Sequence, residues 1–354
     1  MLPRARADAF CRRFGLRLPI LLAPMAGACP PTLAAAVANA GGLGACGALM
    51  MDAAAIVRFA AEFRATSPGG LQINLWIPEP RPPRRDAAQE ARVRAFLAGW
   101  GPAVPDGAGE VALQDFAAQC AAVLAAAPAV VSSIMGLYPA DFVARLKQAK
   151  IAWFATATTL AEARAAEAAG ADAVIAQGME AGGHRGAFDQ DAAERRQVGL
   201  FALLPAIADK VGVPVIAAGG IADGRGVAAA LTLGASAVLV GTAFLRAPEA
   251  GILPAWADAL AGTAPEDTML TRAFSGRAGR TIATDYVQAA AAAGAFAAYP
   301  IQRGLSAAMK EAGARQGDVH RVQAWAGQSA ALARAEPAAA ITERLWREAQ
   351  ALLA

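Results

Sequence analysis

The stretch VPVIAAGGIADGRGVAAALTLGASAVLVGT, residues 213–242, decides the fold class. An apolar run at 214–218 is followed by a glycine turn, an alanine-rich stretch of helix length at 225–233 and a second apolar run at 237–241. Uninterrupted apolar runs of this length suit strands that are buried on both faces of a sheet. A helix between two such strands predicts a parallel βαβ unit.

The same unit recurs along the chain. Strands are expected at 18–23, 43–47, 71–77, 129–135, 151–155, 173–177, 214–218 and 237–241. Helices are expected between them at 32–40, 53–64, 139–148, 159–169, 200–210 and 225–233. Gly41, Gly170 and Gly234 follow three of these helices, where a residue without Cβ suits the left-handed C-terminal position, and Thr158 or Thr159 can cap another. A series of eight strands favours a closed (β/α)₈ TIM barrel, and a doubly wound open sheet is the alternative.

Two segments do not follow the repeat. Residues 78–127 form a long insertion that begins with a stretch rich in proline and arginine, and 254–354 form a mostly helical tail. We expect both to build a lid, or a small and mainly helical second domain, over the barrel mouth. The barrel would then comprise 1–77 and 128–253.

Composition narrows the class of protein. The 354 residues are 56% hydrophobic and 17% charged, with 32 Lys and Arg against 29 Asp and Glu, so we expect a globular protein with a small-molecule partner and no nucleic acid. Prolines interrupt the uncharged stretch 18–51, which argues against a membrane span. The four widely spaced cysteines indicate no metal site and suit the cytoplasm. The oligomeric state stays open.

Barrel enzymes carry their sites at the carboxyl ends of the strands, so residues there are the candidates. The first strand ends in a Pro24-Met25 turn, and Asn74 stands within an apolar strand, where either a bound ligand or a neighbouring strand could satisfy its amide. The sixth strand continues into QGMEAGGHRG, residues 177–186, which holds one of two histidines. His184, with an ordinary pKa near 6.5, could exchange a proton near neutral pH. We interpret His320, in a polar part of the tail, as a surface residue.

The last two strands end in glycine turns, Gly219-Gly220 and Val240-Gly241-Thr242. Backbone N–H groups in such turns can bind a phosphate, and the Thr242 hydroxyl can add a donor. The two turns occur in this order about twenty residues apart, which predicts a ligand that carries a phosphate.

These motifs, together with Ser275-Gly276-Arg277 and Tyr299-Pro300 in the tail, resemble the nitronate monooxygenases, formerly called 2-nitropropane dioxygenases. The resemblance implies a flavoprotein that binds FMN noncovalently, with His184 as the catalytic base and Tyr299 at the substrate. It implies that the flavin is lined by Pro24, Met25, Asn74, Gln177, Gly182, Gly183, Gly219, Gly220, Val240, Gly241 and Thr242.

The expected function is that of an oxidoreductase that uses FMN and O2. It would oxidise an alkyl nitronate, or a nitroalkane after His184 removes its α-proton, to a carbonyl compound and nitrogen oxyanions. One alternative keeps the flavin but uses NAD(P)H to reduce an enoyl thioester or a quinone. Another is a barrel that binds a phosphorylated ligand without redox chemistry, as an isomerase or a sensor. A cysteine nucleophile is disfavoured because no cysteine follows Cys120.

Overall fold

The computed structural model describes residues 1–79 and 85–354. The central sheet has eight parallel strands: β1 (Ile20–Leu22), β2 (Gly44–Gly47), β3 (Leu71–Trp76), β4 (Val130–Ile134), β5 (Ala152–Ala157), β6 (Ala173–Gln177), β8 (Val215–Ala218) and β9 (Ala237–Val240). They are ordered β1-β9-β8-β6-β5-β4-β3-β2. The Leu22 N–H also donates to the Leu43 carbonyl at 2.9 Å, which joins β1 to the start of β2. The sheet therefore closes on itself, and the predicted TIM barrel is confirmed.

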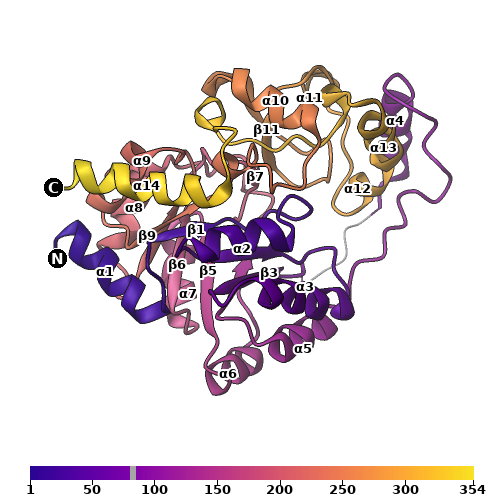
Figure 1. Ribbon diagram of the computed structural model, residues 1–354. Coiled ribbons are helices and arrows are strands. Elements are labelled where there is room, and N and C mark those ends of the chain that lie inside the picture. Colours follow the sequence, from indigo (N-terminus) through magenta and orange to yellow (C-terminus); the bar gives the residue numbers. More distant parts are fainter. Residues whose placement is uncertain (80–84) are drawn as a thin grey trace.

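Helices surround the strands (Figure 1), six of them in the predicted positions and a seventh at Phe116–Ala126, within the insertion that was expected to belong to the lid. They are α2 (Pro31–Asn39), α3 (Ala53–Thr66), α5 (Phe116–Ala126), α6 (Ala140–Gln148), α7 (Leu160–Ala168), α8 (Leu200–Ala208) and α9 (Gly224–Thr232). The Thr159 side chain caps α7 by accepting the Glu162 N–H. Gly41, Gly170 and Gly234 have φ of +102°, +94° and +114°, as expected of residues that end a helix in the left-handed region.

Two apolar clusters hold the barrel together. One fills its interior and includes Leu21, Phe154, Ile175 and Ile216, while a much larger cluster lies between the strands and the helices. The N-terminal helix α1 (Pro3–Phe14) contributes Phe10 to the interior cluster, so it covers the barrel end opposite the cavity described below.

A second unit lies beside the barrel mouth (Figure 1). It contains α4 (Ala87–Leu97), α10 (Pro254–Gly262), α11 (Asp285–Ala293), α12 (Ile301–Leu305) and α13 (Ala307–Gln316). It also contains a small antiparallel sheet of β10 (Thr268–Thr271), β11 (Gly279–Ile282) and β7 (Gly183–His184). Val93 and Leu97 of α4 pack with Phe274, Tyr286 and Leu305 in a separate apolar cluster. The unit is thus helical as expected but includes strands.

The apolar clusters divide the expected lid segments differently from the sequence-based boundaries. In the 78–127 insertion, of which 80–84 lie outside the described residues, α4 joins the second unit, but Cys120 and Val123 of α5 belong to the large barrel cluster. At the end of the tail, α14 (Ala338–Leu352) places Ile341 and Leu345 in that cluster, and Figure 1 shows it lying along the barrel. We propose that α5 and α14 be counted with the barrel.

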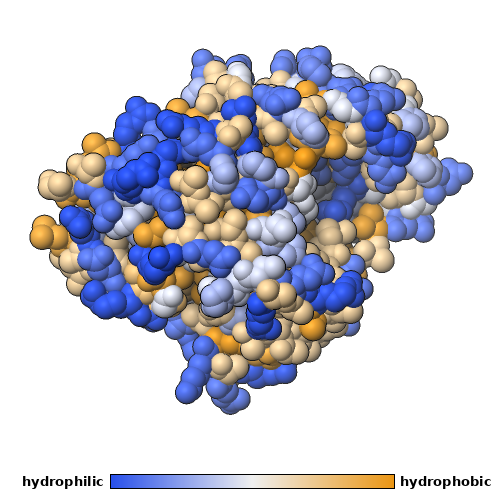
Figure 2. All heavy atoms as spheres, in the orientation of Figure 1, coloured by the Kyte–Doolittle hydropathy of each residue, from blue (hydrophilic) through white to orange (hydrophobic). Residues whose placement is uncertain are grey.

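The surface and the cysteines add two observations. Figure 2 shows hydrophobic residues dispersed among hydrophilic ones over one face of the molecule. Within the described residues, none of the helices is both long and apolar enough to span a bilayer.

All four cysteines are free and buried, and burial raises the pKa of Cys29 to about 12. A thiol of this kind is not an activated nucleophile.

Candidate active site

A cavity of about 720 Å³ opens at the carboxyl ends of the barrel strands. Eleven of the thirteen site residues expected from the sequence line it: Pro24, Met25, Asn74, Gln177, Gly182, Gly183, His184, Gly219, Gly220, Gly241 and Thr242. Of the other two, Val240 is buried inside β9 and Tyr299 lies behind the wall, so neither lines the cavity in the described part of the chain.

One end of this cavity is built from the turns after β8 and β9. Gly219 and Gly220 have φ of +114° and +67°, a region that favours glycine. Within the described part of the chain, the backbone N–H groups of 219–221 and 241–243 have no hydrogen-bond acceptor. Several free N–H groups beside the Thr242 hydroxyl make a site suited to a phosphate.

Two of the amide residues that line the cavity, Asn74 and Gln177, are bound to neighbouring protein groups. The Asn74 Nδ2 donates to the Ser132 Oγ at 3.0 Å, so the pairing of Asn74 with a neighbouring strand, one of its two expected roles, is present. The Gln177 Nε2 donates to the His184 carbonyl at 3.1 Å, and its Oε1 accepts the Gly186 N–H at 2.8 Å. Gln177 therefore fixes the turn that presents His184.

His184 lies on β7, where the small antiparallel sheet of the second unit borders the cavity. Its ring makes edge-on contacts with Trp76 and Trp325, with both ring centroids 4.7 Å away. Its Nε2 is 2.7 Å from the Ser275 Oγ. Antiparallel pairing of His184 with Gly279 holds the backbone. Contacts on three sides leave the imidazole little freedom to rotate.

The electrostatic surroundings of His184 differ from the sequence-based expectation. Burial, together with the nearby charges of Arg277, Arg303 and Lys310, lowers the pKa of His184 to about 3. The expectation of a histidine that titrates near neutral pH is therefore wrong, because that expectation used the pKa of an exposed imidazole. His184 is neutral at physiological pH and can accept a proton, but weakly.

Two cations in this wall were not singled out from the sequence. Arg303 of α12 and Lys310 of α13 both line the cavity, whereas no Asp or Glu side chain does so in the described part of the chain. Burial, with the charge of Arg303, lowers the pKa of Lys310 to about 7. Isolated Lys and Arg residues in a helical tail carry no sequence signal, so only the fold could locate them.

Arg277 forms a second layer behind the cavity. It is buried, donates to the Glu79 carboxylate at 2.8 Å, and lies 4.4 Å from the centroid of the Tyr299 ring and 5.3 Å from that of Trp76. Tyr299 is thus next to Trp76, which lines the cavity, although Tyr299 itself does not line it in the described part of the chain; its contact with the substrate stays a prediction.

The chain matches a known protein family over most of its length. Residues 11–348 match the family model described as nitronate monooxygenase. The chain belongs to the nitronate monooxygenase family. A nitronate monooxygenase of Paraburkholderia phytofirmans is 43% identical over 342 residues, which is 94% of this chain and 93% of that protein. The expected family and enzyme class are confirmed.

Two solved structures extend the comparison. The nitroalkane oxidase of Streptomyces ansochromogenes has a TM-score of 0.86 and 36% identity, and the match covers 96% of this chain and 98% of that one. FabK of Thermotoga maritima has a TM-score of 0.76 and 28% identity, with 98% and 96% covered. The fold is thus that of a barrel shared by proteins with different names.

Proposed function

We propose that the protein oxidises anionic alkyl nitronates with O2 and that it uses FMN to do so. This proposal rests on the difference between two parts of the cavity, a phosphate site at one end and a cationic wall around His184. A turn site suited to one phosphate lies at one end, and the wall around the neutral His184 contains Arg303 and Lys310 without a lining carboxylate in the described residues.

The phosphate end fits FMN better than a dinucleotide. The turns after β8 and β9, whose N–H groups have no acceptor in the described residues, line the same cavity as the Thr242 hydroxyl. The Gly-x-Gly-x-x-Gly run at residues 42–47 leads into and forms strand β2, so it does not occupy the turn from a strand to a helix where a dinucleotide fingerprint binds its phosphates. Pro24, Met25 and Asn74, which line the cavity from other strand ends, would then contact the rest of the flavin. When bound, FMN would supply the electron transfer between the substrate and O2.

The charge of the wall supports a nitronate as the substrate. A nitronate carries a negative charge, and Arg303 and Lys310 would attract and orient it within a partly buried cavity. A neutral nitroalkane gains less from these cations and must first lose a carbon-bound proton to His184. Because the pKa of His184 is lowered to about 3, that base is weak, and we infer that nitroalkanes are the poorer substrates.

A flavin reductase, the alternative expected from the sequence, is the second candidate, because it would use the same barrel and the same phosphate site. Anaerobic stopped-flow mixing separates the two reactions. We expect a nitronate alone to reduce the flavin rapidly, seen as loss of its absorbance, and NADPH to reduce it slowly. Rapid bleaching by NADPH, followed by turnover of an enoyl thioester or a quinone, would support the reductase instead.

The cofactor is tested on the purified protein. We expect a yellow preparation that releases FMN on denaturation, identified by chromatography. Release of mainly FAD would contradict the single phosphate site. A colourless protein that does not take up FMN would support a barrel without redox chemistry.

A further inference from the structure

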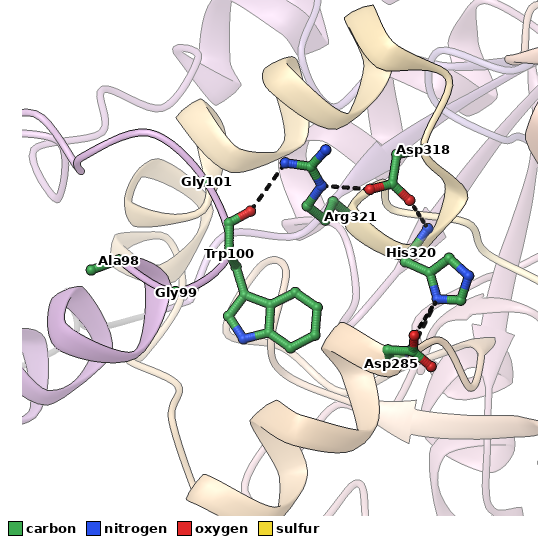
Figure 3. A pocket seen from close by; sticks show the side chains of 8 residues that line it. All are labelled: Ala98, Gly99, Trp100, Gly101, Asp285, Asp318, His320 and Arg321. Atoms are coloured by element: carbon green, nitrogen blue, oxygen red, sulfur yellow. Dashed lines mark hydrogen bonds and ion pairs between the residues drawn. The ribbon is translucent and has the colours of Figure 1, made fainter.

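A short segment of the tail crosses the phosphate end of the cavity. This segment, residues 326–329, is called the strap here. It follows the 3₁₀ helix Val319–Arg321, whose surroundings appear in Figure 3. There the Arg321 Nε donates to the Asp318 carboxylate at 2.6 Å, and the His320 Nδ1 lies 3.1 Å from the Asp285 carboxylate. His320 is half exposed, in agreement with its interpretation as a surface residue, and these contacts anchor the chain before the strap begins.

The strap is hydrogen-bonded to three separate loops of the cavity, although it lies far from each of them in the sequence. The bonds run from the Gly327 N–H to the Thr242 Oγ1 at 3.0 Å, from the Gln328 N–H to the Glu180 carbonyl at 3.0 Å, and from the Ser329 Oγ to the Gly220 carbonyl at 2.7 Å. Gly327 and Ser329 themselves line the cavity. The strap thus joins the loops after β6, β8 and β9.

Packing between the strap and these loops leaves no room for an additional methyl group. A Cβ on Gly182 would lie 2.5 Å from the Gly327 nitrogen, and a Cβ on Gly327 would lie 2.9 Å from the Glu180 carbonyl oxygen. Contacts this short cannot be accommodated without moving backbone. Gly182, which the resemblance assigned to the flavin, is therefore also required by the strap.

The two hydroxyl contacts determine which groups face a phosphate. Because the Thr242 Oγ1 accepts the Gly327 N–H, its own hydrogen is free to donate elsewhere. Ser329 donates to the Gly220 carbonyl and so holds that oxygen toward the strap, while the N–H groups of the turn have no acceptor in the described residues. A carbonyl oxygen directed at a phosphate would repel it, and a free hydroxyl hydrogen would attract it.

We propose that the strap completes the phosphate-binding site and controls how fast the flavin leaves. The proposal rests on the binding of FMN proposed above. The strap orients the Thr242 hydroxyl, fixes the Gly220 turn and covers this end of the cavity, so FMN is released only after the strap separates from the loops. Loss of a strap contact is expected to increase the rate of FMN dissociation.

Ser329→Ala is the first test because it removes one hydrogen bond and adds no atom. FMN dissociation is followed on the holoenzyme as the recovery of flavin fluorescence after dilution. One neutral hydrogen bond corresponds to about a 2- to 10-fold faster release. Gln328→Ala is the matched control, because Gln328 is bound to Glu180 through its backbone and should release FMN at the wild-type rate.

Gly327→Ala tests the packing and should accelerate release by about tenfold or more, because the new methyl group displaces the strap. Hydrogen exchange gives a readout independent of the release rate. The amides of Gly327 and Gln328 should exchange faster in Ser329→Ala than in the wild-type protein, and more slowly when FMN is bound. Circular dichroism checks that each variant is folded.

The outcomes separate the two proposals. Wild-type release rates in both Ser329→Ala and Gly327→Ala, with FMN still bound, would refute the role of the strap and leave the cofactor proposal intact. Equal acceleration in Gln328→Ala would also refute it, because the effect would not depend on these contacts. A wild-type protein that binds no FMN would contradict the proposed function itself.

Discussion

Replacement of His184 by Asn tests the mechanism most directly. The imidazole sits between Trp76 and Trp325 with its Nε2 on Ser275, and Asn keeps a hydrogen-bonding group there but removes the base. A nitroalkane must lose its α-proton before oxidation, whereas a preformed nitronate has already lost it. The substitution should therefore reduce nitroalkane oxidation more than nitronate oxidation.

The size of the effect follows from the pKa of His184. A well-placed general base contributes about 10² to 10⁴ in rate when its pKa is near the working pH. Here the pKa is lowered from 6.5 to about 3. The lower pKa makes His184 a weaker base than an unperturbed histidine. We expect His184→Asn to lower kcat/KM for a nitroalkane by about 10²-fold or less, at the low end of the range for a positioned base.

The assay is O2 consumption with a nitroalkane and with its preformed nitronate, normalised to bound flavin. His320→Asn is the matched control, since it alters the other histidine at a distance from the cavity and should leave both substrates unaffected. The pH profile adds a second readout, because kcat/KM for the nitroalkane reports the pKa of the free enzyme's base. Equal losses on both substrates, or a fall in nitroalkane activity as the pH drops through 6.5, would refute this reasoning.

Three further predictions concern other residues. Burial lowers the pKa of Lys310 to about 7, so kcat/KM for a nitronate should fall as the pH rises above 7 and the ammonium loses its proton. In Lys310→Met, the steady-state pH profile of kcat/KM should lack this fall. Thr242→Val should weaken FMN binding by about 1.5–3 kcal/mol, as measured by fluorescence titration, while Thr242→Ser should not. Gly220→Ala should lower the free energy of unfolding by about 1–2 kcal/mol and should also weaken FMN binding. The control Gly15→Ala, at a similar φ of +70°, should lower the free energy of unfolding and leave FMN binding unchanged.

Much of the barrel was predictable because its local signals agree with one another. Strands buried on both faces read as unbroken apolar runs, and glycines such as Gly170 mark the helix ends. The boundaries of the lid were harder to predict from the sequence. Helix α5 and the C-terminal α14 are separated from their barrel partners by other elements, and amphipathic helices give no indication of which surface they will cover.

The residues of the candidate site likewise fall into those that the sequence could predict and those that it could not. Residues such as Gly219 and Thr242 were predictable because they follow directly after strands, where a barrel fixes their position. Arg303, Lys310 and Ser329 were not, since each reaches the cavity only through the folding of the tail. The pKa of His184 was also inaccessible, because it depends on burial and on charges supplied by those distant segments.

This division has a consequence for how the enzyme selects its substrate. The barrel loops supply the phosphate end of the cavity, while helices of the second unit supply Arg303 and Lys310. Burial is the main cause of the low pKa of His184, and Arg303 and Lys310, which favour an anionic substrate, lower it further. The charges that attract a nitronate therefore also weaken the base that a nitroalkane requires. Neutralising Lys310 should shift both together, raising KM for the nitronate while raising the pKa of His184.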